Sequence, residues 1–235
     1  MIVQVHRSAE RGGANHGWLE TKHSFSFADY HNHARMNFGA LRVLNDDTIA
    51  PSMGFDPHFH KEMEIVTIVL DGQLKHEDNA GNFGVISENE VQMMTAGSGI
   101  VHSEFNPSEK KKVSLLQIWV LPKQKNAKPA YGQAKIEKKD IAEKFGLIIS
   151  PKKEKYFAIN QDAYFYLGDF SGPTKAPLKS HSDGSGFFIF VIEGGLKIGK
   201  DALKKRDSAQ ITGARDIEMD ISKNSKVLVI EVPVA

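Results

Sequence analysis

The chain of 235 residues contains no cysteine. This absence excludes disulfide bonds, thiolate metal sites and cysteine nucleophiles, so His, Asp or Glu would have to hold any metal ion. No apolar run approaches the about twenty residues that a transmembrane helix needs. The first residues, 1–7, lack the apolar core of a secretion signal. We therefore expect a soluble, cytoplasmic protein without a membrane partner.

The chain also has little excess charge of either sign, with a formal net charge of +1. Such a chain has no global field that would attract nucleic acid or an anionic membrane. Short basic runs occur at residues 110–112, 138–139 and 204–206, each beside an expected turn. A solvated surface explains these runs better than a nucleic-acid groove, and we expect no direct nucleic-acid partner.

Two short motifs carry the candidate chemistry. The first is His58-x-His60, followed by Glu64, and the second is His102-x-Glu104. Side chains alternate between the two faces of a β-strand, so both residues of each motif would point the same way. If the two strands line one small barrel, three imidazoles and a carboxylate converge, which is a nitrogen and oxygen site for a first-row metal.

The surrounding sequence predicts strands and tight turns. Residues 64–70 form a β-branched apolar run that ends at the turn signal Asp71-Gly72. Residues 78–82 predict a second turn, residues 91–95 a strand, and residues 97–99 a third turn just before the second motif. This arrangement favours two antiparallel strands that carry the metal ligands.

Further strands are expected on both sides of these motifs. In the N-terminal segment, Trp18, Phe25 and Phe27 should be buried, and the segment should lie along the barrel and close one edge strand. Residues 38–44 predict a strand that ends at the polar residues 45–47, and residues 112–121 predict a long strand that stops at a proline.

The second half of the chain shows a weak sequence similarity to the first. Residues 188–197 resemble residues 66–75, and residues 227–233 resemble residues 116–122, which suggests an internal duplication. We predict an N-terminal metal-binding barrel at residues 1–125 and a C-terminal barrel at residues 126–235.

The two copies differ at the candidate metal site. In this alignment Ser180 and Ser182 match the first histidine pair, and Gly213 and Arg215 match the second motif. His181 is the one imidazole nearby, and it has the wrong parity. The second barrel is therefore expected to have kept the fold and lost the metal site.

The other histidines are expected to have structural roles. His31-x-His33 lies in a polar stretch without a following strand, and a loop fits it better than a metal site. His6, His16 and His23 are isolated, so we expect them to pack or to form hydrogen bonds.

The spacing of the two motifs resembles the cupin superfamily, and the chain as a whole resembles a bacterial pirin. The strongest match is the run from His58 to Glu104, especially residues 76–78, 81–82 and 94–104, and residues 14–19, 23–27 and 40–47 fit as well. The resemblance implies an all-β bicupin of two jelly-roll barrels (a double-stranded β-helix) with a few short helices.

The resemblance also implies one metal ion, usually iron, in the N-terminal barrel. The matching ligands are His58, His60, His102 and Glu104; Glu64 stands where many other cupins place their carboxylate. The expected ion is Fe²⁺, although Mn, Co, Ni, Cu or Zn would accept the same nitrogen and oxygen donors. Lys61 and Glu62 depart from the Arg-Gly of many relatives and should alter the pocket rim only.

Two classes of function follow from the resemblance. One is a quercetin 2,3-dioxygenase, which opens a flavonol with O2 and releases CO, with Glu104 as ligand and catalytic base. The other is an iron-binding regulator that a protein partner, such as a transcription factor or a metabolic enzyme, recognises. A zinc or manganese isomerase is a third alternative.

The pocket lining depends on strand parity. Phe55, Phe59, Met63 and Met94 are close in sequence to the candidate ligands. Phe59 and Met63 have odd parity relative to His58, so in a regular strand they should point away from the metal.

Overall fold

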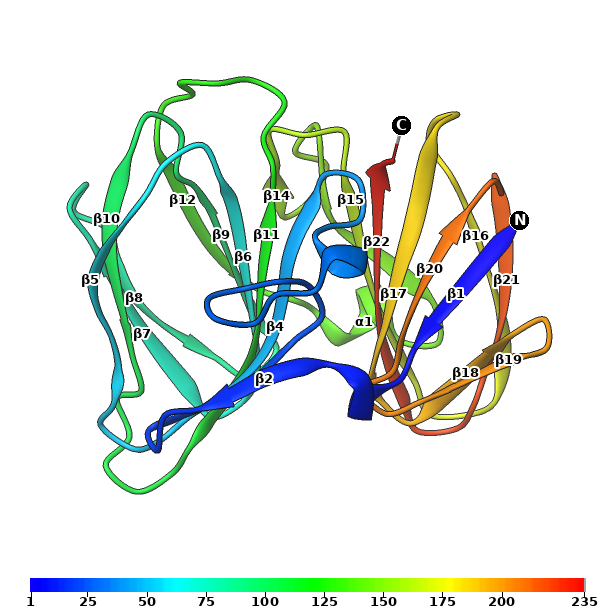
Figure 1. Ribbon diagram of the computed structural model, residues 1–235, viewed down its shortest axis with the longest axis horizontal. Helices are drawn as coiled ribbons and strands as arrows, with labels where there is room; N and C mark the ends of the chain where they lie inside the picture. The colour runs from blue at the N-terminus through cyan, green and yellow to red at the C-terminus, as the bar shows by residue number, and fades with distance from the viewer. Residues whose placement is uncertain (235) are drawn as a thin grey trace. The chain divides into compact units, whose positions relative to one another are not determined.

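The computed structural model describes residues 1–234, and these residues form two compact units (Figure 1). The first barrel comprises Gly12–Asn37 and Leu41–Lys135. The second barrel comprises Met1–Arg11, Phe38–Ala40 and the described residues from Ile136 onward.

The first barrel is built from a seven-stranded and a four-stranded sheet. The large sheet has the order β12-β9-β6-β11-β4-β3-β2, and the small sheet has the order β5-β10-β7-β8. The strands are β2 (Gly12–Asn15), β3 (Leu19–His23), β4 (Leu41–Ile49), β5 (Gly54–His60), β6 (Glu64–Asp71), β7 (Gln73–Asp78), β8 (Phe83–Ser87), β9 (Glu90–Thr95), β10 (Ile100–Phe105), β11 (Val113–Val120) and β12 (Ala130–Lys135).

The second barrel repeats this architecture. Its sheets have the orders β1-β20-β17-β22-β15-β13-β14 and β16-β21-β18-β19. The strands are β1 (Ile2–His6), β13 (Phe145–Ser150), β14 (Phe157–Ala158), β15 (Tyr164–Phe170), β16 (Thr174–Lys179), β17 (Ser185–Glu193), β18 (Gly195–Ile198), β19 (Asp201–Lys204), β20 (Ser208–Thr212), β21 (Asp216–Ile221) and β22 (Ser225–Pro233).

Helices are few and short in both units. The helical elements of the described chain are η1 (Ser8–Glu10), η2 (His33–Arg35) and α1 (Lys138–Ile141). The predicted all-β class is therefore confirmed. In the part of the chain that the structure describes, no helix has the length and apolarity to cross a membrane.

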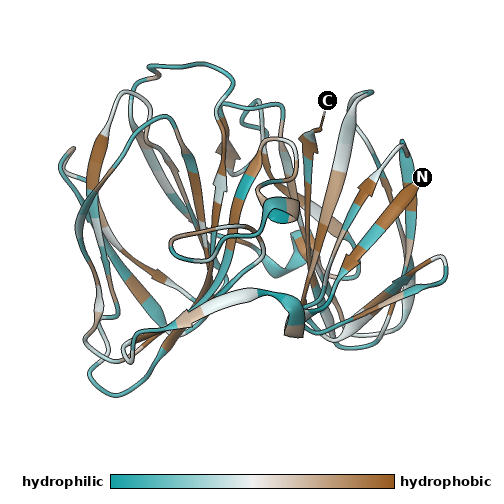
Figure 2. Cartoon of the chain, viewed as in Figure 1, coloured by the Kyte–Doolittle hydropathy of each residue, from teal (hydrophilic) through white to brown (hydrophobic). Residues whose placement is uncertain are grey.

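Strands β7 and β10 of the small sheet alternate between buried and more exposed residues because this sheet buries one face. Along β10 every second residue is buried, and β7 shows the same period. Figure 2, coloured by hydropathy, shows hydrophobic stretches on strands of both units. This alternation turns His102 and Glu104 of β10 toward the barrel interior, where they are 2% exposed. The sequence pattern of the strands thus decides which side chains enter the barrel.

The division into units differs from the predicted boundary at residues 125 and 126. The N-terminal strand β1 pairs with β20 of the second barrel, and β12 pairs with β9 of the first. The segment before β4 nevertheless extends the large sheet of the first barrel, as expected, because β3 pairs with β4 and β2 pairs with β3.

The predicted end of the strand at residues 38–44 is wrong. This strand, β4, runs from Leu41 to Ile49 and continues through the polar residues that were expected to end it. Asn45 and Asp47 are 3% and 4% exposed, so their side chains lie in the barrel interior. Tertiary burial overrides the local turn preference of Asn and Asp at these positions.

Candidate metal centre

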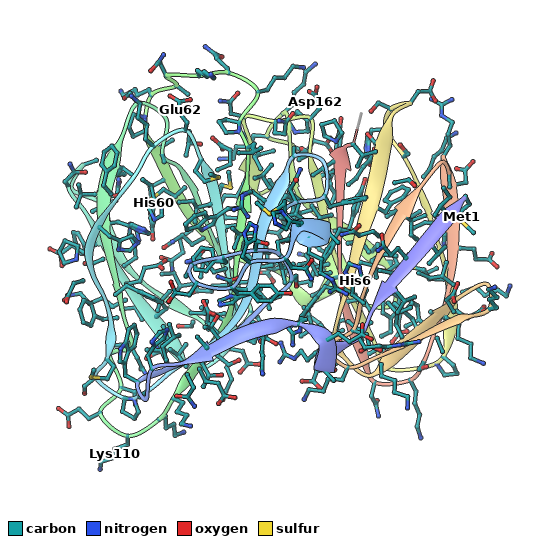
Figure 3. The ribbon with its side chains drawn as sticks, viewed as in Figure 1. Met1, His6, His60, Glu62, Lys110 and Asp162 are labelled. Carbon is teal, nitrogen blue, oxygen red and sulfur yellow. The ribbon has the colours of Figure 1, made fainter. Side chains whose placement is uncertain are left out.

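The structure brings three of the predicted ligands together. His58 and His60 lie on β5, and His102 lies on β10 directly opposite His58 in the strand ladder. One donor nitrogen of each ring lies within 4.8 Å of the other two. Figure 3 shows the labelled His60 between the two sheets of the first barrel. The two-residue spacing of each motif produces this convergence.

These rings have lone pairs that suit a metal ion. The Nε2 atom of His102 is buried and has no hydrogen-bond partner among residues 1–234. The Nδ1 atom of His58 lies 2.8 Å from the carbonyl oxygen of Asp56, and donation to that oxygen leaves its Nε2 as the free donor atom. An orphaned buried nitrogen on a ring that lies beside two other imidazoles fits a metal site.

Burial favours the neutral form of His60 and His102. It lowers the pKa of His60 to about 4, with a further contribution from His58. Burial likewise lowers the pKa of His102 to about 2, and the neighbouring histidines add to this effect. Neutral rings are the form that binds metal ions, so no proton has to leave them at neutral pH.

Glu104 is a buried acid, 2% exposed, with three hydrogen-bond donors around it. Its carboxylate accepts hydrogen bonds from Gln117 Nε2 at 2.8 Å, from Gln92 Nε2 at 3.3 Å and from the Thr67 hydroxyl at 3.5 Å. Burial raises the pKa of Glu104 to about 7, against these hydrogen bonds. A carboxyl group with this pKa can both accept and release a proton near neutral pH.

The position of Glu104 differs in one respect from the expected four-ligand set. A carboxylate oxygen of Glu104 lies within 4.8 Å of donor nitrogens of His102 and His76, and Glu104 is not in the cluster formed by His58, His60 and His102. His76 was not among the predicted site residues. It lies on β7 opposite Glu104, and alternate burial along β7 is the signal that could have identified it.

Glu64 is the second acid to consider, because it stands where many other cupins place their carboxylate. Glu64 is fully buried, and its Oε2 accepts a hydrogen bond from the Thr95 hydroxyl at 2.8 Å. Within the described residues it belongs to neither candidate metal cluster. Glu104 therefore remains the better carboxylate ligand.

A cavity of about 630 Å³ opens beside the candidate centre. His58, His60 and Glu104 form part of its wall. Its aromatic lining residues are Trp18, Phe27, Tyr30, Phe55 and Trp119. Its polar lining residues include Thr21, His23, Asn45, Asp47 and Gln117. Such a cavity can hold a flat, polar aromatic molecule next to the ligands.

Strand parity holds for Phe59 and Met63 but not for Phe55, where the ladder between β5 and β10 shifts register. Phe55 lines the cavity and contacts Trp18 with ring centroids 5.2 Å apart. Phe59 points outward and is 62% exposed, which confirms its predicted orientation. Met94 belongs to a separate packing cluster, against which Met63 packs.

The remaining histidines of the first barrel lie outside the centre. His31 and His33 are exposed and contact each other with ring nitrogens 3.4 Å apart. His23 is buried, and its Nδ1 lies 2.9 Å from the Asn45 side-chain oxygen. The expectation that His23 forms hydrogen bonds is therefore confirmed.

In the second barrel, the predicted match to the second motif is displaced. Gly213 and Arg215 precede β21, and Ser182 lies beyond the end of β16. Strands β7 and β18 each begin directly after a turn glycine, so we take them as equivalent. Strand β7 pairs with β10, and β18 pairs with β21. With β7 and β18 aligned in this way, Ile217 takes the register position of His102, and Met219 takes that of Glu104. Both belong to the apolar core of the second barrel.

His181 forms a polar cluster of its own in the second barrel. Its ring stacks on Tyr164 at 3.5 Å, and its Nδ1 lies 2.8 Å from the fully buried carboxylate of Glu231. The hydroxyl of Tyr166 lies 3.2 Å from the same nitrogen. These contacts account for His181 without a metal ion.

Comparisons with known proteins identify the family. The pirin family model matches residues 3–120, and the model of the quercetinase C-terminal cupin domain matches residues 147–232. The quercetin 2,3-dioxygenase of Escherichia coli is 34% identical over 233 residues, which cover 99% of each protein. A pirin-like protein of Caulobacter vibrioides is 37% identical over 222 residues, which cover 94% of this chain and 95% of the relative.

Solved structures agree with these matches. The bacterial pirin YhhW of Escherichia coli, in complex with nickel(II), has a TM-score of 0.94 and 34% identity to this chain, with 100% of both chains covered. The two β-barrels described above are thus cupin domains, and the predicted bicupin fold is confirmed. On these grounds the chain belongs to the pirin family.

Proposed function

We propose that this chain is a metal-dependent dioxygenase that opens flavonols such as quercetin with O2 and releases CO. The observation that carries the proposal is the meeting of three imidazoles beside an aromatic-lined cavity of about 630 Å³. The names of the relatives, quercetin 2,3-dioxygenase among them, support the same chemistry.

The three histidines would hold the ion and Glu104 would complete the ligand set. A bound divalent ion, for which Fe²⁺ is our first choice, would supply Lewis acidity and a path for electrons between flavonol and O2. Mn, Co, Ni, Cu and Zn fit the same donors, and a related pirin binds nickel(II).

Glu104 would take the proton of the flavonol 3-hydroxyl as the catalytic base. Its pKa of about 7 suits this role, because such a carboxyl group changes its protonation state near neutral pH. Gln117 and Gln92 hold the carboxylate in place through their side-chain amides. The aromatic wall, Trp18 and Trp119 in particular, would orient the flat rings and exclude water.

Aerobic turnover of quercetin tests the proposal. Protein loaded with Fe²⁺ should bleach the flavonol absorption band and release CO, whereas His58→Ala should be inactive. His31→Ala is the matched control, because His31 is an exposed histidine outside the cluster. Equal inertness of wild type and His58→Ala, both shown to be folded and with metal bound to the wild type, would overturn the proposal.

A second candidate function is an iron-dependent regulator that a protein partner binds. One observation favours it: Phe59, which lies between His58 and His60 on β5, is 62% exposed. An exposed aromatic next to two candidate ligands could report the metal state to a partner. The regulator would be favoured by two results together. The metal-loaded wild type captures one partner that Phe59→Ser does not capture, and the wild type does not turn over quercetin.

Metal analysis of freshly purified protein separates the isomerase alternative. Zinc in the site would favour that class, and iron would favour the dioxygenase. The cytoplasmic location stays a prediction.

A further inference from the structure

A second buried histidine lies directly behind the candidate metal centre. In the ladder between β7 and β10, His76 stands opposite Glu104, and Asp78 stands opposite His102. His76 is fully buried. Its Nδ1 lies 3.4 Å from Nδ1 of His102, and its Nε2 lies 3.4 Å from Oδ2 of Asp78. Asp78, His76 and His102 thus form a continuous row inside the first barrel.

The acceptor at the far end of this row is fixed. The Oδ1 atom of Asp78 accepts hydrogen bonds from the backbone N–H groups of Ala80 and Asn82, both at 2.9 Å. Its Oδ2 atom accepts another from Asn82 Nδ2 at 2.9 Å. A carboxylate that receives three donors acts only as an acceptor, so the hydrogen between Asp78 and His76 belongs to Nε2 of His76.

The tautomers of the two histidines follow one after the other. With its proton on Nε2, a neutral His76 has a lone pair on Nδ1, which can only accept. The Nδ1 of His102 must then carry the proton that it donates to His76. This tautomer leaves the lone pair of His102 on Nε2, the atom that is buried without a hydrogen-bond partner.

We propose that Asp78 and His76 are positioning residues that fix the ring orientation and tautomer of His102, so that its Nε2 is presented to the metal ion. This inference rests on the proposed metal centre and adds two residues to it. Hydrogen bonds of this kind hold metal-bound histidines in many proteins. Tyr131 supports the row, since its ring stacks on His76 with centroids 4.7 Å apart and an interplanar angle of 20°.

The geometry also defines the competing arrangement. His76, His102 and Glu104 have donor atoms within 4.8 Å of one another, so His76 could bind an ion itself. In that arrangement the Nδ1 of His76 would bind the metal instead of accepting a hydrogen bond from His102. The two arrangements place protons and metal on different nitrogens and can be told apart directly.

Nitrogen NMR of the wild-type protein makes this distinction. Zn²⁺ is diamagnetic, so the zinc-loaded full chain with ¹⁵N-labelled histidine can be studied by long-range proton–nitrogen correlation. We expect His102 to be protonated on Nδ1 and metal-bound through Nε2, and His76 to be protonated on Nε2 with a free Nδ1. A metal-bound His76, or a His102 without a proton on Nδ1, would overturn the proposal.

Metal affinity provides a second readout. In His76→Phe the Nδ1–H group of His102 loses its hydrogen-bond acceptor. The affinity for Ni²⁺ or Zn²⁺, measured in competition with a chelator, should then fall roughly 10–100-fold. Tyr131→Phe is the matched control, because it keeps the stacked ring and should bind metal as the wild type does. Unchanged affinity in a folded His76→Phe protein would contradict the proposal.

These measurements are independent of turnover. If the NMR result and the affinity loss are as expected but quercetin is not cleaved, the dioxygenase proposal fails and the positioning role stands. If quercetin is cleaved and His76→Phe binds metal normally, the positioning role fails and the dioxygenase stands.

Discussion

Replacing Asp47 with Asn should stabilise the metal-free first barrel above neutral pH. Asp47 lies on β4, is 4% exposed and lines the cavity. The Thr21 hydroxyl donates a hydrogen bond to it at 2.5 Å. Burial raises the pKa of Asp47 from 3.8 to about 7, despite the opposing effect of this hydrogen bond. The ionised form is therefore costly in the folded protein.

The sign and size of the effect follow from this pKa. Between pH 4 and pH 7 the unfolded chain releases the proton of Asp47 while the folded chain keeps it, so the free energy of unfolding falls as the pH rises. A rise in pKa from 3.8 to about 7 corresponds to at most ~4 kcal/mol at pH 8. Asn resembles the protonated acid and can still accept from Thr21, so Asp47→Asn removes this loss.

Tryptophan fluorescence is a suitable assay, because both tryptophans of the chain lie in the first barrel. Urea unfolding of metal-free wild type and Asp47→Asn should give similar stability at pH 4.5 and a more stable variant at pH 8. Asp71→Asn, at the exposed end of β6, is the control and should show no gain. If Asp47→Asn is less stable than wild type at both pH values, the carboxylate is not the destabilising group and the reasoning is refuted.

The other predictions concern the metal, the cavity and the second core. A metal ion at 100 times its Kd should stabilise the wild type by ~2.7 kcal/mol, seen as a rise in Tm, and His58→Ala should show no such rise. In Gly12→Ala the new Cβ would lie 2.3 Å from the ring of Tyr30; displacement of that ring from the cavity wall should weaken flavonol binding, measured by tryptophan quenching, and unchanged binding would contradict it. Phe170→Ala should cost about 3–5 kcal/mol in urea unfolding because Phe170 is fully buried in the second core, while a change in metal affinity would be unexpected.

Much of the candidate site could be predicted because it depends on local spacing. A strand has a period of two, so His58-x-His60 alone puts both rings on one face, and the turn glycines before His102 fix where the next strand begins. The pairing of His102 with His58 is different, because β5 and β10 are far apart in the chain and meet in a long-range ladder.

The polar wall of the cavity could not be found in the same way. Asn45 and Asp47 read as turn residues, since Asn and Asp favour turns wherever nothing else decides. Their burial depends on partners far along the chain, such as Thr21 for Asp47 and His23 for Asn45. The pairing of β1 with β20, more than 190 residues away in sequence, is equally invisible to local patterns.

Each barrel has its own ladder of equivalent strands. Three positions of this ladder show how the first barrel supports a polar site. In the first barrel Thr67 pairs with Gln92 on one side and with Gln117 on the other, and these three side chains hydrogen-bond to Glu104.

In the second barrel Ile189 takes the place of Thr67 in the aligned strands, and its ladder partners are Ala209 and Val229. All three belong to the apolar core. A carboxylate placed among them would be buried without donors, which costs several kcal/mol. The cupin fold therefore accommodates a polar interior in one barrel and an apolar interior in the other, and the amide and hydroxyl donors around Glu104 reduce the cost of burying this carboxylate.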